Sequence, residues 1–393
     1  MRDRYDVVIV GGGLSGSSTA YFLGANPDFR GRVLVVERDP TYANAPSAKA
    51  TGGIRQQFST PENIRIGLFG AHFAKNVDEY LAVDGESTGV VFREQGYLLL
   101  ATSAALPILQ ANHRTQLAEG ADIVFLRPAE IAERFPWVRT DGLEGGFFGQ
   151  RNEGWVDPYA FLQAFRRKAR ALGADYVEDR AVDVVTAGGR VTAVRLERGG
   201  LVECGAMLDA AGASGGRAVG RMLGVDLPVE SRLRTTFVWE CREDVSRGPL
   251  TVLPSGVAWR PEGRTCIGNL SPPPERDPER FDHEIDHDEF ERDIWPLLAE
   301  WIPPFEALKV TGAWCCHYDF NTLDENAILG LLPGYDNAYV ALGFSGHGMQ
   351  QSPAVGRALS ELIVHGEYRS LDLGRFGYAR VATGEGIHES NCW

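Results

Sequence analysis

The pattern of apolar and polar positions in the first forty residues predicts a strand, a helix and a second strand in close succession. Residues 5–10 are an almost unbroken apolar run, residues 14–23 have a helical pattern, and residues 32–36 form a second apolar run that ends at Glu37. Short, nearly continuous apolar runs are typical of parallel strands that helices cover on both faces. This region is therefore predicted to form a βαβ unit of an α/β sheet.

Further along the chain, helical and strand patterns alternate less regularly. We expect helices at residues 61–81, 104–119, 157–172 and 352–365, the first starting at Pro61 and the third at Asp157-Pro158. We expect strands at residues 90–93, 97–101, 174–178, 182–185, 190–197, 201–204, 206–212, 235–240, 250–253, 257–260, 265–270 and 340–344. Residues 41–60 and the Pro- and charge-rich residues 271–290 are predicted to be polar loops.

The turn between the first strand and the first helix reads G-G-G-L-S-G at residues 11–16, a G-x-G-x-x-G pattern. Gly11 permits the tight turn, Gly13 lets a pyrophosphate approach the backbone, and Gly16 lets the helix pack closely against the strand. The N-terminus of the helix offers unpaired N–H groups to phosphate charge. Glu37, 21 positions after Gly16, is placed to bind the ribose hydroxyls of an adenosine. The pattern predicts a dinucleotide site and suits NAD and FAD equally well.

Composition narrows the classes of function. The chain has 393 residues and a formal net charge of −14, which disfavours nucleic acid and anionic membrane surfaces as partners. No window approaches the run of about 18 apolar residues that a membrane helix needs. Because the first strand begins at Tyr5, we expect no leader segment and a cytoplasmic protein. The six cysteines include no C-x-x-C pair and no zinc-type cluster, so we expect free thiols and no metal site.

A second glycine-rich turn lies near the C-terminus. Residues 340–344 form an apolar strand, residues 345–349 read S-G-H-G-M, and a helix follows. The N-terminus of that helix is suited to face electron-rich oxygen on a ligand. Between the two glycine turns, the apolar strand at 206–212 ends in A-A-G, which brings a backbone without bulky side chains close to a flat ligand.

These three signatures together resemble the D-amino-acid-oxidase-type superfamily of flavoproteins, in the branch that contains sarcosine oxidase, dimethylglycine dehydrogenase and glycine oxidase. Within it the chain is most similar to the FAD-dependent oxidoreductase-domain family known as a respiratory complex I assembly factor. The resemblance covers nearly the whole chain. The motifs that carry the closer likeness are long and occur in the same order, at residues 52–59, 61–64, 135–137, 153–155, 319–322 and 384–387.

The resemblance implies an α/β fold with a Rossmann-like FAD-binding domain and an interleaved, β-rich (α+β) substrate domain. The implied FAD-binding domain is discontinuous and consists of residues 1–85, 150–225 and 325–393, and the substrate domain consists of residues 86–149 and 226–324. The residues implied to contact FAD are Gly11, Gly13, Leu14, Ser15, Gly16, Glu37, Arg38, Ser47, Thr51, Gly52, Val182, Ala211, Gly212, Phe344, Gly346, His347, Gly348 and Met349.

In this superfamily a C–H bond next to an amine nitrogen delivers hydride to flavin N5, and the resulting imine is hydrolysed or released. The step needs a neutral amine held near the flavin in a dry pocket. The resemblance places Arg55 near the flavin; the alternative is a loop arginine paired with an acid. The predicted substrate is a small amine, and the electron acceptor is either O₂ or a redox partner. Aromatic residues that suit the pocket wall, and equally the core, are Tyr97, Trp259, Tyr318 and Phe344.

Three differences separate this chain from the sarcosine oxidase pattern. Phe58 and Gln350 stand where those enzymes hold the substrate carboxylate with cations, so a neutral pocket is expected. Cys266 stands where a lysine above the flavin activates oxygen, which favours a dehydrogenase. Cys316, in C-H-Y, matches the cysteine that links covalently to the flavin, but its spacing to the following T-L-D-E is one residue longer. Non-covalent FAD is favoured, with a link through Cys316, or less readily Cys315, as the alternative.

The sequence therefore predicts an FAD-dependent amine or amino-acid dehydrogenase whose catalytic region contains Arg55, Cys266, Tyr318 and Gln350. Two other functions stay open. The closer resemblance implies a flavin-bearing assembly or scaffold protein with little turnover. A tailoring oxidase that acts on a larger, carrier- or peptide-bound amine is the other alternative, because a neutral pocket suits such a substrate.

Overall fold

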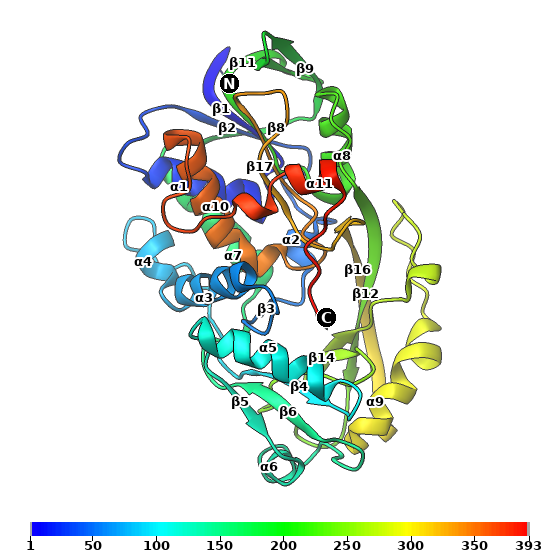
Figure 1. Ribbon diagram of the computed structural model, residues 1–393. Helices are drawn as coiled ribbons and strands as arrows, with labels where there is room; N and C mark the ends of the chain where they lie inside the picture. Colours follow the sequence, from blue (N-terminus) through cyan, green and yellow to red (C-terminus); the bar gives the residue numbers. More distant parts are fainter. Residues whose placement is uncertain (1, 391–393) are drawn as a thin grey trace.

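Two eight-stranded sheets organise the protein, and Figure 1 shows them in its upper and lower parts. The structure is a computed structural model that describes residues 2–390. The long strands β12 (Val229–Glu240) and β16 (Lys309–Asn321) run along one side of the molecule and reach from one part to the other (Figure 1). The C-terminal tail, as far as it is described, runs down towards the lower part (Figure 1).

The first sheet consists of β1 (Arg4–Val10), β2 (Val33–Glu37), β8 (Asp175–Glu178), β9 (Ala181–Ala187), β10 (Arg190–Leu196), β11 (Gly200–Asp209), β17 (Ile328–Leu331) and β18 (Ala338–Leu342). Its order is β17-β18-β11-β1-β2-β8, and β10 and β9 extend it beside β11. β1 pairs in parallel with β2 and β11, and β11 pairs in parallel with β18. The central strands are buried on both faces, which explains their almost continuous apolar sequence.

Helices cover both faces of the first sheet. Val7 and Ile9 of β1 pack on the face that carries α1 (Leu14–Ala25), α3 (Pro61–Lys75), α7 (Pro158–Ala171) and α10 (Gly348–His365). Val8 and Val10 pack on the opposite face, with α8 (Gly212–Met222). The remaining helical segments are α2 (Pro46–Lys49), α4 (Val77–Leu81), α5 (Leu106–Ala118), α6 (Pro128–Arg134), α9 (Trp295–Trp301), α11 (Ala379–Thr383) and the short turns Pro274–Arg276, Phe290–Ile294, Pro303–Ala307 and Gly374–Phe376.

The second sheet has the order β16-β12-β15-β14-β13-β4-β6-β5. Its other strands are β4 (Tyr97–Ala101), β5 (Ile123–Leu126), β6 (Gly145–Gly149), β13 (Leu250–Val252), β14 (Ala258–Glu262) and β15 (Thr265–Asn269). One face carries an aromatic core in which the rings of Trp239 and Trp259 lie 5.5 and 4.8 Å from the ring of Phe305. The other face lines the cavity described below. A separate two-stranded sheet pairs β3 (Gly53–Ile54) with β7 (Gly154–Trp155).

Most of the predicted elements are confirmed, and the α/β fold class is correct. The helix predicted at residues 157–172 is α7, and the carboxylate of Asp157 caps it by accepting from the backbone N–H of Ala160 at 2.7 Å. The first sheet takes its strands from residues 4–37, 175–209 and 328–342, whereas the second takes them from residues 97–149 and 229–321. The predicted domain boundaries stay a prediction.

Three predicted elements were wrong in detail. Residues 90–93 form no strand, because only Arg93 makes a single bridge, with Trp155. The helix predicted at residues 61–81 breaks at Asn76, whose backbone is not helical. The final long helix begins at Gly348 rather than at residue 352 and contains Pro353. Proline cannot donate to the carbonyl four residues before it, and here the hydroxyl of Ser352 donates to that carbonyl, on Met349, at 2.9 Å.

A buried ion pair fixes the C-terminal segment to the rest of the protein. Asp324 is fully buried, and its carboxylate accepts from Nε of Arg380 at 2.7 Å and from the backbone N–H of Ile387 at 2.8 Å. The amide of Asn321 donates to the same carboxylate at 2.8 Å. Because every partner lies on a different segment, Asp324 holds the end of β16, α11 and the C-terminal tail together.

We expect Asp324→Ala to lower the free energy of unfolding by about 3–5 kcal/mol, because it leaves the buried guanidinium of Arg380 without its carboxylate. Urea denaturation followed by circular dichroism measures the loss. The matched control is Glu197→Ala, which removes an ion pair of 2.6 Å with Arg180 whose side chains are 50% and 62% exposed. That change is expected to cost less than about 1 kcal/mol. Equal losses in the two variants would contradict the role given to Asp324.

Candidate functional site

The turn from β1 to α1 has no room for side chains. Gly11 has φ +102°, and a Cβ atom there would lie 2.2 Å from the carbonyl oxygen of Ala210. A Cβ atom on Gly16 would lie 2.0 Å from the carbonyl oxygen of Gly11, and one on Gly13 would lie 2.8 Å from Oγ of Ser47. Gly11 and Gly16 therefore have the close-packing roles that the G-x-G-x-x-G pattern predicts, and the approach of a pyrophosphate to Gly13 stays a prediction.

Polar groups converge on this turn. One carboxylate oxygen of Glu37 accepts from the backbone N–H of Gly12 at 2.8 Å, and burial raises the pKa of Glu37. The backbone N–H of Leu14, in the first turn of α1, donates to Oγ of Ser47 at 3.1 Å. The hydroxyl of Tyr42 is buried beside Gly12 and has no partner among the described residues. This unpaired hydroxyl beside the N-terminus of α1 fits a nucleotide. Tyr42 was not predicted, because a single tyrosine in a polar loop gives no signal.

The other residues predicted for the nucleotide half lie around the same end of the sheet. Ser15 is in the first turn of α1, and Arg38 is exposed directly after Glu37. Val182 lies where the register between β9 and β10 shifts, so no residue of β10 stands opposite it. Such a bulge takes a residue out of the ladder, as backbone contact with an adenine edge would require. Ala211 and Gly212 follow β11 and begin α8, with Gly212 at φ +60°.

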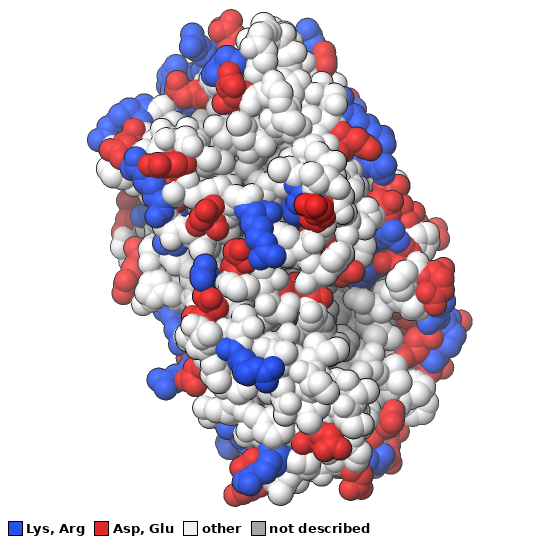
Figure 2. Space-filling view, viewed as in Figure 1, with Lys and Arg blue, Asp and Glu red and all other residues white. Residues whose placement is uncertain are grey.

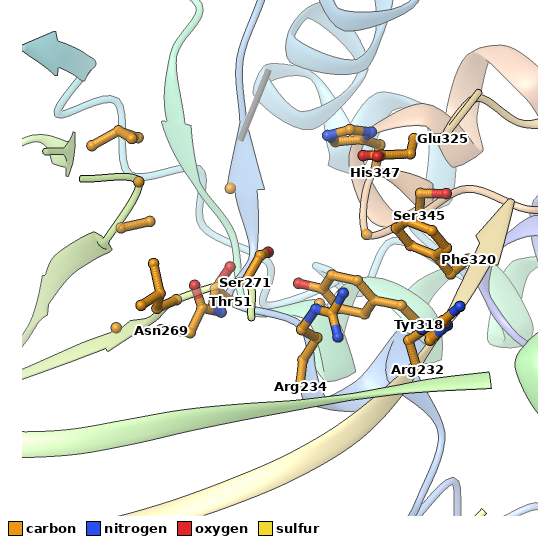
Figure 3. A pocket seen from close by; sticks show the side chains of 18 of the residues that line it. Thr51, Arg232, Arg234, Asn269, Ser271, Tyr318, Phe320, Glu325, Ser345 and His347 are labelled. Carbon is orange, nitrogen blue, oxygen red and sulfur yellow. The ribbon is translucent and has the colours of Figure 1, made fainter. Parts of the chain in front are cut away.

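A cavity of about 740 Å³ lies between the two sheets. Thr51, Gly52 and Gly53 line it from the segment that follows the nucleotide turn, and residues 345–347, 349 and 350 line it from the C-terminal glycine turn. The second sheet supplies the opposite wall, where Tyr318, Phe320, Arg232 and Arg234 lie (Figure 3). The structure therefore brings the segment after the nucleotide turn and the C-terminal glycine turn to one cavity.

The C-terminal glycine turn is held by an acid that the sequence reasoning did not single out. The carboxylate of Asp319 accepts from the backbone N–H groups of Gly343 and Phe344 at 2.9 and 3.2 Å, and burial raises its pKa to about 6. A Cβ atom on Gly346 would lie 2.5 Å from the ring of Tyr318. Phe344 itself is buried in the core next to Gly348 and does not line the cavity. The D-F-N-T motif quoted from the sequence contained the signal for Asp319.

Arg55, His347 and Gln350 lie together at the cavity. The backbone N–H of Arg55 donates to Oε1 of Gln350 at 2.8 Å, and its Nη2 lies 3.2 Å from Nε2 of His347. Its guanidinium carbon is 4.8 Å from the centre of the Phe58 ring and 5.7 Å from that of Tyr97. The sequence thus identified residues that are neighbours in space, although they are about 290 positions apart in the chain.

A buried glutamate supports the Arg55 segment from behind. Glu153 accepts from the backbone N–H of Gln56 at 2.6 Å and from Nε2 of Gln57 at 2.7 Å. Burial raises the pKa of Glu153 to about 7, although its hydrogen bonds and the charge of Arg55 act against this. The carboxylate binds the backbone of Gln56 and the side chain of Gln57, and so helps to hold the neighbouring Arg55 in place.

Cys266 is a correction to the predicted site. It lies in the aromatic core on the far face of the second sheet, and its contact with Cys241 together with burial raises its pKa. Its neighbours Ile267 and Asn269 line the cavity instead. Side chains alternate along a strand, so a one-residue difference in register places the side chain on the opposite face. Cys266 is therefore not a residue of the cavity.

Cys316 lies on the same face of β16 as Tyr318, and Cys315 lies on the other. Burial raises the pKa of Cys316 to about 12, so its thiol is protonated at neutral pH. Cys204, Cys241, Cys266, Cys315 and Cys316 are free thiols, and Cys392 lies outside the described residues. The contact of Cys316 with the flavin stays a prediction, and the Cys316 thiol is not a thiolate.

The cavity wall carries charged side chains beyond the two predicted positions, which the expectation of a neutral pocket did not include. The predicted positions Phe58 and Gln350 are uncharged, but the wall also carries Arg232 and Arg234 from β12 and Arg260 from β14. The Nε atom of Arg260 donates to the carbonyl oxygen of Thr51 at 2.8 Å. The sequence contained a signal in R-L-R at residues 232–234, where two arginines share one face of a strand. It was missed because the strand was predicted to begin only at residue 235.

Neither a metal cluster nor a membrane helix is found in the part of the chain that the structure describes. No group of three or more His, Cys, Asp or Glu side chains among residues 2–390 is arranged to hold a metal ion. No helix in that range is both long and apolar enough to cross a membrane. On the face drawn in Figure 2, basic and acidic side chains are interspersed, and no extended basic patch is visible.

Known proteins resemble this chain over almost its whole length. A protein of Bos taurus named "FAD-dependent oxidoreductase domain-containing protein 1" is 39% identical over 421 residues, which are 98% of this chain and 87% of that protein. Monomeric sarcosine oxidase of Arthrobacter sp. (strain TE1826) is 25% identical over 389 residues, which are 93% of this chain and 94% of that protein. The structure of L-proline dehydrogenase from P. horikoshii superposes with a TM-score of 0.87, covering 98% of this chain and 100% of that one, at 22% identity.

The family match agrees with the two glycine turns and the cavity between them. Residues 6–362 match the family described as "FAD dependent oxidoreductase". The matched stretch contains the nucleotide turn, the second sheet and the C-terminal turn, and the fold agrees with that of the solved relative. The chain therefore belongs to the FAD dependent oxidoreductase family.

Proposed function

We propose that this protein is an FAD-dependent enzyme that oxidises a C–N bond of an amine or amino-acid-derived substrate. The observation that carries the proposal is the single cavity onto which the Thr51–Gly53 segment, the C-terminal glycine turn and the second sheet all open. Similarity to sarcosine oxidase supports an amine as substrate. When bound, the flavin would supply the site that accepts hydride from the substrate carbon.

The residues of the chain divide the binding of FAD between two glycine turns. Gly11, Gly13 and Ser47 would hold the pyrophosphate, and Glu37 would hold the adenosine ribose. The N-terminus of α10, which begins at Gly348, would face the pyrimidine end of the ring. Positive potential at a helix N-terminus stabilises the negative charge that gathers there upon reduction.

The cavity wall is suited to hold a neutral amine away from water. Tyr97 and Tyr318 line it, and burial raises the pKa of Tyr318 to about 12, so that its hydroxyl stays neutral. Arg55 is fixed by Gln350 and by the segment that Glu153 holds. A substrate between these groups would be oriented by them while its C–H bond points to the flavin.

We infer that FAD is bound without a covalent link, because attack by a cysteine needs a thiolate and the buried Cys316 holds its proton. The electron acceptor is a separate matter. The preference for a dehydrogenase depended on Cys266, which faces away from the cavity, whereas Arg260 brings a cation to the cavity wall. O₂ and a redox partner therefore both stay candidate electron acceptors.

Turnover of an amine would reduce the flavin. Anaerobic addition of sarcosine, dimethylglycine, L-proline and related amines to the flavin-loaded protein is expected to bleach the visible flavin band with at least one of them. Dithionite is the control that the flavin is reducible, and admission of O₂ or of an artificial acceptor then compares the rates of reoxidation. A flavin that dithionite bleaches and no amine bleaches would favour an assembly or scaffold function instead.

The second prediction concerns the nucleotide cradle. Gly13→Val is expected to lower bound FAD below about one-tenth of the wild-type amount, because a side chain there fills the space between α1 and Ser47. Flavin absorbance per protein measures the loss. The matched control is Gly312→Ala, whose Cβ atom would have Val238 Cγ2 as its nearest neighbour, at 3.9 Å. A Gly13→Val protein with full FAD content would contradict the assignment.

The third prediction concerns the flavin linkage. Acid precipitation of the wild-type protein is expected to leave all flavin in the supernatant, and the intact mass is expected to equal that of the polypeptide. Cys316→Ser is expected to behave identically. Flavin that stays with the wild-type precipitate and is released by Cys316→Ser would show a covalent bond and overturn the inference.

A further inference from the structure

Arg234 has an unused hydrogen-bonding edge. It is 5% exposed, and its Nη1 and Nη2 atoms donate to the two carboxylate oxygens of Asp277 at 2.7 Å each, while Nη1 also donates to the carbonyl oxygen of Leu233 at 2.8 Å. Its Nε atom is buried and has no partner among the described residues. A guanidinium has five N–H donors, so Nε–H and the second N–H of Nη2 are left. These two donors form the side-on edge that binds a second carboxylate in bidentate fashion.

Arg232 repeats this arrangement two residues earlier on β12. Its side chain is 16% exposed, Nη2 donates to Glu230, and Nη1 lies 3.9 Å from Asp277. Its Nε atom is also buried without a partner in the described part of the chain. Both arginines line the cavity, and Figure 3 shows Arg234 beside the ring of Tyr318 with Arg232 next to it. Two adjacent guanidinium groups therefore share one carboxylate of Asp277 and retain free donors.

The arginine pair and Arg55 both lie near Tyr318. The guanidinium of Arg234 is 5.3 Å from the centre of the Tyr318 ring, and both Arg234 and Arg55 act on the pKa of Tyr318 in the direction that lowers it, against the larger effect of burial. Arg55 lies with His347 and Gln350, at the end of the cavity that the C-terminal turn forms. The cavity thus has cations from two separate segments of the chain near Tyr318.

Acids of the cavity wall do not neutralise the arginine pair beyond Asp277. Asp324 is paired with Arg380, and Glu389 accepts from the backbone N–H and hydroxyl of Ser59 and from the amide of Asn63. Glu325 also lines the cavity, but it is exposed at its surface. A buried guanidinium edge without a partner is costly, and a ligand carboxylate would satisfy it.

We propose that Arg232 and Arg234 form a subsite for a carboxylate that the substrate carries at the end remote from its oxidised C–N bond. The substrate class is an amine with a distal carboxylate, and a substrate with a second carboxylate near the amine would meet Arg55 as well. This inference rests on the proposed function, since it names the substrate class of the same cavity. Arg232 and Arg234 act here by positioning the substrate, and no proton transfer is assigned to them.

Redox-inert ligands test the subsite without turnover. Titration calorimetry of the flavin-loaded protein would compare succinate, glutarate and adipate with butyrate, valerate and hexanoate, which have the same numbers of carbon atoms. At least one dicarboxylate is expected to bind about tenfold or more tightly than its monocarboxylate partner, because one further charged hydrogen-bonded contact forms. Equal affinities for all three pairs would overturn the proposal. The result does not depend on whether any amine reduces the flavin, so it is separable from failure of the proposed function.

Variants connect the preference to the two arginines. Arg232→Gln, and the double change Arg234→Gln with Asp277→Asn, are each expected to reduce the preference for the dicarboxylate to within about threefold and to leave monocarboxylate affinity unchanged. The double change removes both members of the buried pair, so that no carboxylate is left unpaired, whereas Arg232→Gln leaves Glu230, which is 28% exposed, without its cation. Arg276→Gln is the matched control, because this arginine is 53% exposed and pairs with Asp293. A preference that survives both variants would assign the arginines a structural role only.

Discussion

The antiparallel pairing of β12 with β16 is the constraint on which the candidate site depends. It sets Arg232 opposite Tyr318 and Arg234 opposite Cys316. Because side chains alternate along a strand, these four residues share the face that the cavity uses. The end of the same β16 strand carries Asp319, which holds the backbone of the C-terminal glycine turn. A slip of one residue in this pairing would turn the arginines into the aromatic core and separate the turn from the wall.

The parts of the site that depend on local sequence were predictable. The G-x-G-x-x-G pattern predicts both a tight turn and a position directly after a buried strand. The lack of room for a Cβ atom at Gly11 and Gly16 agrees with that prediction. The central strands of the first sheet were predicted from short apolar runs, because strands that are buried on both faces have almost continuous apolar sequences. Neighbours such as Arg55 and Gln350, far apart in the sequence, were found only through the family resemblance.

The opposite wall of the cavity was not predictable to the same degree, because it depends on register across strands. Cys266 was expected above the flavin, yet it lies in the core while Ile267 faces the cavity. The expectation of a neutral pocket considered only Phe58 and Gln350, neither of which belongs to the second sheet. The positive charges of the wall come from Arg232, Arg234 and Arg260. Which face of the sheet carries these side chains is decided by how β12, β14, β15 and β16 pair. Pairing between strands is a tertiary property, which a pattern along one strand does not contain.

The Pro- and charge-rich segment at residues 271–290 shows how composition misleads at such a site. It was predicted to be a solvated loop, and most of it is exposed, but Asp277 is only 7% exposed because both arginines of β12 lie against it. Two guanidinium groups side by side repel one another, and a shared carboxylate offsets that repulsion at the cost of removing all three charges from water. Arg232 also pairs with Glu230, yet Nε of each arginine keeps a donor that a further anion would fill. The loop is therefore part of the cavity wall, and its Asp277 holds the two arginines that would bind a substrate carboxylate.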